Sequence, residues 1–127
     1  MSLSDGKVSP AVGVSDMAKA KEFYEGKLGL TGGGETADGG VDYQCGGGTR
    51  LHVYPSPSAK PSGATLAAWD VDDFEAVVDE LIGNGVNFEQ YAEGPLKTDE
   101  KGIAALNGDK IAFVKDPDGN ILAIATA

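Results

Sequence analysis

Apolar and polar residues alternate near the start of the chain in the pattern of a half-buried strand. The apolar face of this predicted strand consists of Val8, Pro10, Val12 and Val14. Asp16 follows the strand and is suited to cap a helix, because its carboxylate can accept hydrogen bonds from the first backbone N–H groups. The positions that recur at helical spacing are Met17, Ala20, Tyr24 and Leu28. Gly29 is expected to end this helix.

A second stretch repeats this pattern at a constant offset of 57 positions, since Val14-Ser15-Asp16 aligns with Val71-Asp72-Asp73. Here a strand should end at Val71, and Asp72 with Glu75 has the spacing of a capping box. The apolar face of the second helix consists of Phe74, Val77, Val78, Leu81 and Ile82. Gly83-Asn84-Gly85 should end that helix. An internal duplication is the simplest explanation of the repeat.

Three strand-like segments, separated by glycines, follow each helix. They span 33–37, 41–45 and 50–54 in the first half, and 86–91, 110–115 and 121–126 in the second. Each half is therefore a module of one strand, one helix and three strands. This arrangement predicts the α+β fold class.

The whole chain, 1–127, reads as a single domain. Module one covers about 7–54, a Pro- and Ser-rich connector covers 55–63, and module two covers about 64–127. The connector is too short to separate independent domains. The polar segment 94–109 is either a lid over a cleft or an ordinary loop.

Composition and charge exclude several classes of partner. Apolar residues make up 41% of the chain, yet no apolar run is long enough to span a membrane. The net charge of −10 disfavours nucleic acid and anionic membrane surfaces, whose phosphates it would repel. The acidity reflects either general solubility or a cleft that attracts cationic ligands. The first residues contain no hydrophobic signal segment, which favours a cytoplasmic location.

Four motifs in this order resemble those of the vicinal oxygen chelate superfamily, which includes glyoxalases, bleomycin-resistance proteins and extradiol dioxygenases. The motifs are VSDMAKAKEFYEGKLGL at 14–30, WDVDDFEAVVDELIGNGV at 69–86, EGPLKTDEKGIA at 93–104 and AFVKDPDGNILAI at 112–124. The resemblance implies that two tandem βαβββ modules form a curled mixed sheet around a central cleft, with the helices on the outer face. It also implies a homodimer.

Metal-dependent members of this superfamily hold their metal with four side chains in the cleft, two from each module. By the family's spacing, these positions are Ser9, His52, Leu66 and Ala123. Leucine and alanine have no ligand atom, and a hydroxyl is a poor ligand for a divalent metal. One imidazole cannot hold a catalytic metal alone, so we expect no metal and no other cofactor. An apolar residue at position 123 also avoids an unpaired carboxylate in the cleft.

The direction of the His52 side chain depends on the register of the strand at 50–54. If Leu51 and Val53 face the helices, His52 points into the cleft, and a slip of one residue reverses this. The apolar pattern favours the first register. The predicted cleft lining is Ser9, Arg50, His52, Tyr54, Leu66, Ala68, Ile121 and Ala123. Trp69 could be a stacking platform for a flat ligand, but alternation along its strand turns it toward the helices and the core.

This lining is that of a binding pocket with few groups for acid–base work, and we predict no catalytic residue. The resemblance to bleomycin-resistance proteins favours a metal-free protein that binds a small organic molecule, with drug sequestration as one role. The alternative is a metal-dependent lyase or dioxygenase of the glyoxalase or extradiol type. Such an enzyme would have to recruit Asp42, Glu89 or Glu93 beside His52. Whether the chain is an enzyme stays open, since His52 could also act as a base without a metal.

Overall fold

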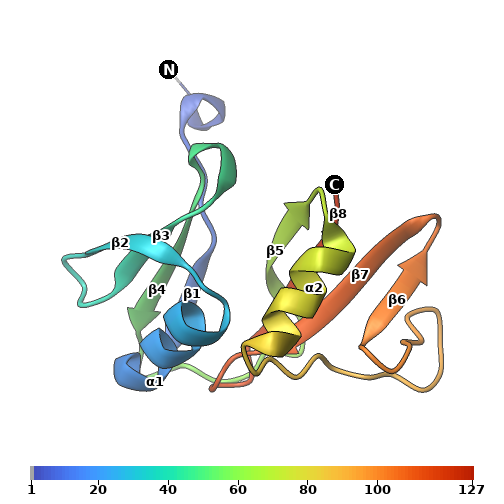
Figure 1. Ribbon diagram of the computed structural model, residues 1–127. Coiled ribbons are helices and arrows are strands. Elements are labelled where there is room, and N and C mark those ends of the chain that lie inside the picture. The colour runs from blue at the N-terminus through green and yellow to red at the C-terminus, as the bar shows by residue number, and fades with distance from the viewer. Residues whose placement is uncertain (1) are drawn as a thin grey trace.

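The computed structural model describes residues 2–127 and contains two four-stranded sheets, each with a helix on one face (Figure 1). The first module comprises β1 (Ala11–Val14), α1 (Met17–Lys21), β2 (Thr31–Glu35), β3 (Val41–Gln44) and β4 (Arg50–Pro55). The second comprises β5 (Thr65–Val71), α2 (Phe74–Gly83), β6 (Ile103–Leu106), β7 (Asp109–Lys115) and β8 (Ile121–Thr126). The predicted α+β class with two tandem βαβββ modules is confirmed. The two sheets stay separate and do not close into one barrel.

The first and last strands of each module are parallel neighbours. The strand order is β1-β4-β3-β2 in one sheet and β5-β8-β7-β6 in the other. Ala11 lies opposite His52 in the first parallel ladder, and Ala68 lies opposite Ala123 in the second. His52 and Ala123 therefore occupy equivalent positions, as the predicted duplication requires.

β1 begins later than the alternation predicts. Val8 is 91% exposed, and the strand starts only at Ala11. Ala11 lies opposite His52 in the parallel register, so β4, which begins at Arg50, has no residue to pair with Val8. Pro10 still accepts a hydrogen bond from the His52 N–H at 3.0 Å but has no N–H of its own to donate. The prediction that Val8 and Pro10 belong to the buried face is wrong.

α1 begins where the sequence predicts, but as an α-helix it ends at Lys21, before the predicted end at Gly29. Oδ1 of Asp16 accepts hydrogen bonds from the backbone N–H groups of Ala18 and Lys19 at 2.9 and 3.2 Å. A π-helical segment, Glu22–Lys27, continues the helix, and both Phe23 and Tyr24 within it are buried in the core. Gly29 then leaves the helix with φ of 74°, a left-handed conformation that glycine adopts without strain. Two short 3₁₀ segments, at Leu3–Asp5 and Gly46–Gly48, complete the first module.

α2 lacks the capping box that the sequence predicts. Asp73 precedes the helix, and its side chain makes no capping hydrogen bond. Glu75 instead accepts a hydrogen bond from Lys110 on β7, at 2.6 Å, so its carboxylate is turned toward the sheet. The predicted end at Gly83–Gly85 is confirmed. No helix within residues 2–127 is long and apolar enough to cross a bilayer.

The segment 86–91 is not the predicted strand. Val86 and Phe88 are buried, and the Glu89 N–H bonds to the Phe113 carbonyl at 2.8 Å, but the segment joins no ladder. The first strand after α2 is instead β6, which lies inside the segment predicted to be a lid or a loop and forms an antiparallel hairpin with β7. Asn107 and Gly108 form the turn, with φ of 50° and 88°. An Asn-Gly pair between two apolar runs is a strong hairpin signal, and it marks this turn in the sequence.

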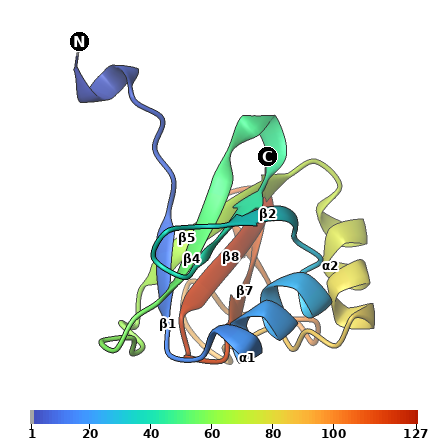
Figure 2. The ribbon, with the colours of Figure 1, turned by 90° about the vertical axis from the view of Figure 1, so that its left-hand side faces the viewer.

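Polar bonds join the two modules around one shared hydrophobic core. The Tyr24 hydroxyl donates to Asp116 at 2.7 Å, and the Asn120 amide donates to the Gly13 carbonyl at 3.0 Å. The Ser15 N–H donates to Asp118 at 3.0 Å. The turn before β8 is thereby attached to the β1–α1 corner of the first module. Both helices lie on the same side of the molecule (Figure 2).

Candidate functional site

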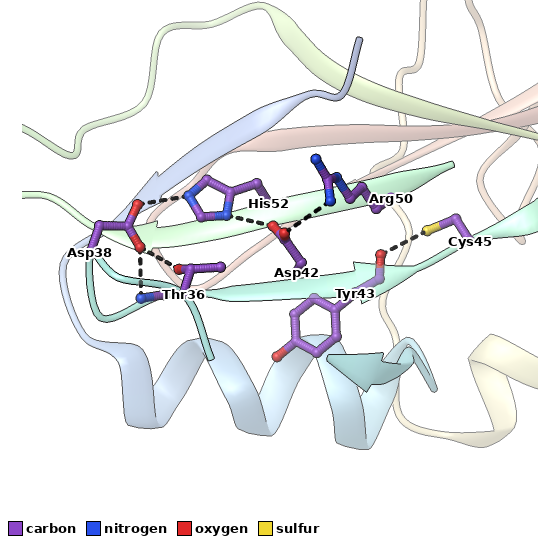
Figure 3. Close-up of polar contacts among 8 residues, drawn as sticks. Thr36, Asp38, Asp42, Tyr43, Cys45, Arg50 and His52 are labelled. Carbon is purple, nitrogen blue, oxygen red and sulfur yellow. Dashed lines mark hydrogen bonds and ion pairs between the residues drawn. The ribbon is translucent and has the colours of Figure 1, made fainter. Parts of the chain in front are cut away.

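The register of β4 places a polar row on the sheet face that points away from α1. Leu51 and Val53 are buried in the core, so the favoured register is confirmed and His52 lies on the opposite face. Asp42 on β3 is the ladder partner of His52 and shares that face. Figure 3 shows these polar side chains on one side of the sheet, with Tyr43 on the other side, toward α1.

Both ring nitrogens of His52 are within hydrogen-bonding distance of carboxylates. Nδ1 lies 2.7 Å from Oδ1 of Asp42, and Nε2 lies 2.8 Å from Oδ2 of Asp38 (Figure 3). A neutral imidazole has only one N–H, so both bonds form only when the ring is doubly protonated. Burial acts to lower the pKa of His52, but the hydrogen bonds and charges of Asp38 and Asp42 outweigh it and raise the pKa above 6.5. The geometry therefore favours an imidazolium, which is unsuited to act as a general base.

Asp38 is held in place by its own hairpin between β2 and β3. Its Oδ1 accepts hydrogen bonds from the Thr36 hydroxyl and from the Gly40 N–H. The bond from Thr36, followed by those from His52 and Gly40, lowers the pKa of Asp38 to about 2. Arg50 adds a second cation, with Nη1 3.6 Å from Oδ2 of Asp42. The cluster of Asp38, Asp42, Arg50 and His52 thus balances two carboxylates against two cations.

Tyr54 extends this row with an aromatic ring. Its ring stacks on the His52 imidazole, with centroids 5.5 Å apart and an interplanar angle of 10°. Gly13 on β1 lies beside it, since a Cβ at position 13 would come within 3.4 Å of the Tyr54 hydroxyl oxygen. The absence of a side chain at Gly13 leaves room for the tyrosine ring.

The predicted apolar residues lie on the second sheet. Leu66 is 38% exposed and sits where the register of β5 shifts against β8. Ala68 is exposed and lies next to Ala123, whereas Ala123 is only 2% exposed. Phe113 lies opposite Ala123 in the β7–β8 ladder and is itself buried. Ala123 is therefore covered, and Leu66 and Ala68 offer the accessible apolar surface.

Some of the residues predicted to line the cleft share one of two hollows. Ser9 and Arg50 line one of about 510 Å³, and Arg50 and Ala68 line another of about 180 Å³ that touches both modules. The structure thus gathers Arg50, His52 and Tyr54 on one strand and brings Ser9 and Ala68 to Arg50. Leu66, Ile121 and Ala123 lie apart from His52, on the other sheet.

Sequence reasoning missed Asp38 as the second partner of His52. The Asp38-Gly39 pair is a turn signal between two strands, but which strand the turn approaches depends on the sheet order. The sequence suggested Asp42 only as a substitute metal ligand. Glu89, another such substitute, pairs with Lys115 at 3.4 Å in the second module.

The residues present do not fit the metal that the family resemblance implies. Within residues 2–127, no three His, Cys, Asp or Glu side chains are arranged to hold a metal ion. At the four family positions, Leu66 and Ala123 have no donor atom, and Ser9 offers only a hydroxyl. Both nitrogens of His52, the remaining position, are already bonded to carboxylates.

The comparisons with known proteins agree with this architecture. A family model described as the Glyoxalase/Bleomycin resistance protein/Dioxygenase superfamily matches residues 8–124, and the chain belongs to this superfamily. A glyoxalase family protein from Bacillus anthracis is 19% identical and superposes with a TM-score of 0.71, covering 95% of this chain and 93% of that one. The glyoxalase/bleomycin resistance protein from Catenulispora acidiphila is 22% identical, with a TM-score of 0.63 and coverage of 95% and 97%. TnmS3, an antibiotic binding protein from Streptomyces, is 25% identical, with a TM-score of 0.66 and coverage of 93% and 92%. No curated protein is similar enough to count as a match.

The His52 cluster makes a prediction for solution NMR. Since His52 is the only histidine, its ring signals can be followed through a pH titration without ambiguity. We expect its pKa to lie above 6.5, and to fall in both Asp38→Asn and Asp42→Asn, because an amide removes the negative charge. Asp70→Asn, on the other sheet, is the matched control and should leave the titration unchanged. A wild-type pKa at or below 6.5 would contradict the geometry.

The raised pKa of His52 also determines how the stability of the fold changes with pH. Because folding raises the pKa of His52, the cluster stabilises the folded chain fully below the unfolded value of about 6.5. That stabilisation is lost as the pH rises through the folded value. The urea midpoint of the wild type should therefore decrease over this interval, and the decrease should be absent in His52→Gln.

Proposed function

We propose that the chain is a metal-free member of its superfamily that binds a small organic molecule on the sheet face turned away from the helices. The observation that supports this most strongly is the donor set at the four family positions. Ser9, Leu66 and Ala123 cannot complete a metal site, and His52 is held between two carboxylates. Its imidazolium is not free to act as a base. Binding is thus better supported than turnover.

The chemistry of this face suggests the kind of ligand. The stacked rings of His52 and Tyr54 form a flat platform that suits an aromatic ligand, with Arg50 as a hydrogen-bond donor at its end. Ala68, which lines a hollow together with Arg50, supplies apolar surface. The positive and negative charges within the His52 cluster balance each other. A preference for cationic ligands would therefore come from the net charge of −10 of the whole chain.

Drug sequestration is the role we propose for such binding. The support is the likeness to TnmS3, which is described as an antibiotic binding protein, together with membership of a superfamily named after bleomycin resistance. From the family resemblance alone, we also propose a homodimer.

A thermal-shift screen of aromatic and drug-like compounds tests this proposal. We expect a binding compound to raise the melting temperature by the same amount with and without a chelator, because no metal takes part. Tyr54→Ala should remove most of the shift, since a stacked ring contributes about 0.5–1.5 kcal/mol beyond its buried area. Ile82→Ala is the control, because Ile82 is 40% exposed on α2, outside the proposed face.

The metal content of the protein distinguishes the proposed metal-free binding from the alternative, a metal-dependent enzyme. The protein is dialysed against excess nickel, zinc, manganese or ferrous iron and then desalted. Stoichiometric metal that disappears in His52→Ala, or a thermal shift that requires metal, would overturn the proposal and favour a lyase or dioxygenase.

A further inference from the structure

A third hollow, a cavity of about 240 Å³, lies on the opposite side of the sheets, between the modules. Leu28 and Leu30, which follow the first helix, form one wall. The other wall comes from the helix-facing side of β5 and from α2, with Trp69, Val77 and Leu81. Figure 1 shows the chain after α1 beside α2. The cavity is thus built from both modules and is distinct from the face of His52.

The Trp69 side chain lies between the hydrophobic core and this cavity. Alternation along β5 turns Trp69 toward the helices, as predicted, and the ring packs against the hydrophobic core. It is nevertheless only half-buried, because the indole borders the cavity. The two walls are linked by a hydrogen bond, since the side-chain amide of Asn84, the residue after α2, donates to the Lys27 carbonyl at 3.2 Å.

We propose that this cavity binds a small organic amine with a compact hydrocarbon body. An apolar cavity of about 150 Å³ is enough for benzene, so this one can take a larger hydrocarbon. Glu80, an exposed residue of α2, lines the cavity together with the apolar residues, and its carboxylate can pair with a cation. The indole face of Trp69 attracts the same charge.

The alternative occupant is a second copy of the chain, and Glu80 argues against it at this surface. Covering the cavity with an apolar surface would bury the Glu80 carboxylate without a cation. An ammonium group avoids this cost because it neutralises Glu80 while its hydrocarbon fills the apolar walls.

Trp69 is the single tryptophan, and its emission can report binding in this cavity. Because Trp69 also lines the hollow beside Arg50 and Ala68, the variants described below assign the response to one of the two. The probes are adamantan-1-amine, adamantan-1-ol and adamantane-1-carboxylate, which share one body and differ in charge. We expect the amine to change Trp69 emission saturably, the alcohol more weakly, and the carboxylate least. Glu80→Gln should weaken the amine about fivefold and leave the alcohol unchanged, which removes the preference.

A matched pair of variants on α2 tests whether the amine occupies this cavity. Val77→Phe places a phenyl ring in the cavity and should abolish the amine response, whereas Ile82→Phe places the same ring on the exposed side of α2 and should not. Tyr54→Ala, in the other proposed site, should leave the amine response intact. No saturable response, an equal response to all three probes, or a response that survives Val77→Phe would overturn the proposal. Trp69 emission that changes with protein concentration would instead indicate a second copy over the cavity.

Discussion

Asp116→Ala is expected to lower the free energy of unfolding by about 3–5 kcal/mol, because it removes a buried charge whose partners stay buried. Asp116 is only 5% exposed. Its Oδ2 accepts hydrogen bonds from the Tyr24 hydroxyl at 2.7 Å and the Asn120 amide at 2.9 Å. Its Oδ1 accepts from the N–H groups of Asp118 and Asn120, both at 2.9 Å. Removing the carboxylate leaves buried donors in both modules without an acceptor.

The Tyr24 hydroxyl is the donor that makes this bond span the modules. Burial, with the nearby Asp116 charge, raises the pKa of Tyr24 far above its usual range, so the phenol keeps its proton. Tyr24→Phe should therefore destabilise by only about 1–2 kcal/mol, since Asp116 keeps its other donors.

Urea denaturation of Asp116→Ala and Asp118→Ala, side by side, measures the effect. Asp118 accepts one bond across the modules, from the Ser15 N–H, and is only half-buried. Its loss should be about 1 kcal/mol. Equal losses for the two variants would mean that Asp116 is not the central acceptor of the module contact.

The elements that could be predicted from the sequence are those whose causes are local. The Asp16 cap, the glycine ends of both helices and the duplicated order of elements depend on neighbours within a few residues. The register of β4 was also predictable, because Leu51 and Val53 must both be buried and a slip would expose them. These features carry His52 to the correct face.

The rest depends on where distant segments meet. Segment 86–91 has a strand-like pattern, but it is anchored by Val86 and Phe88 without a ladder, because β6 pairs with β7 instead. Asp38 contacts His52 only because the turn between β2 and β3 lies against β4. The glycine-rich strand β2 gives little periodicity from which that contact could be inferred.

Gly40→Ala is expected to destabilise the chain by about 1–3 kcal/mol and to detach Asp38 from His52. A Cβ at position 40 would lie 2.3 Å from the Val53 carbonyl oxygen and 2.8 Å from the Tyr54 Cα. Both are backbone atoms of β4, so a side-chain rotation cannot relieve the clash. The hairpin has to move away from β4, and it carries Asp38 with it, since the Gly40 N–H bonds to Asp38 Oδ1 at 2.9 Å.

Two measurements on Gly40→Ala separate a local effect from a general one. Urea denaturation gives the loss of stability, and the NMR titration of His52 should show a pKa lower than in the wild type, because one carboxylate has moved away. Gly34→Ala is the matched control, since a Cβ at Gly34 meets no atom within 4 Å. If Gly40→Ala is destabilised but His52 titrates as in the wild type, Asp38 is not what sets the charge of His52. A lowered pKa of His52 would instead mean that the electrostatics of the candidate site depend on Gly40, because only a residue without a side chain lets Asp38 reach His52.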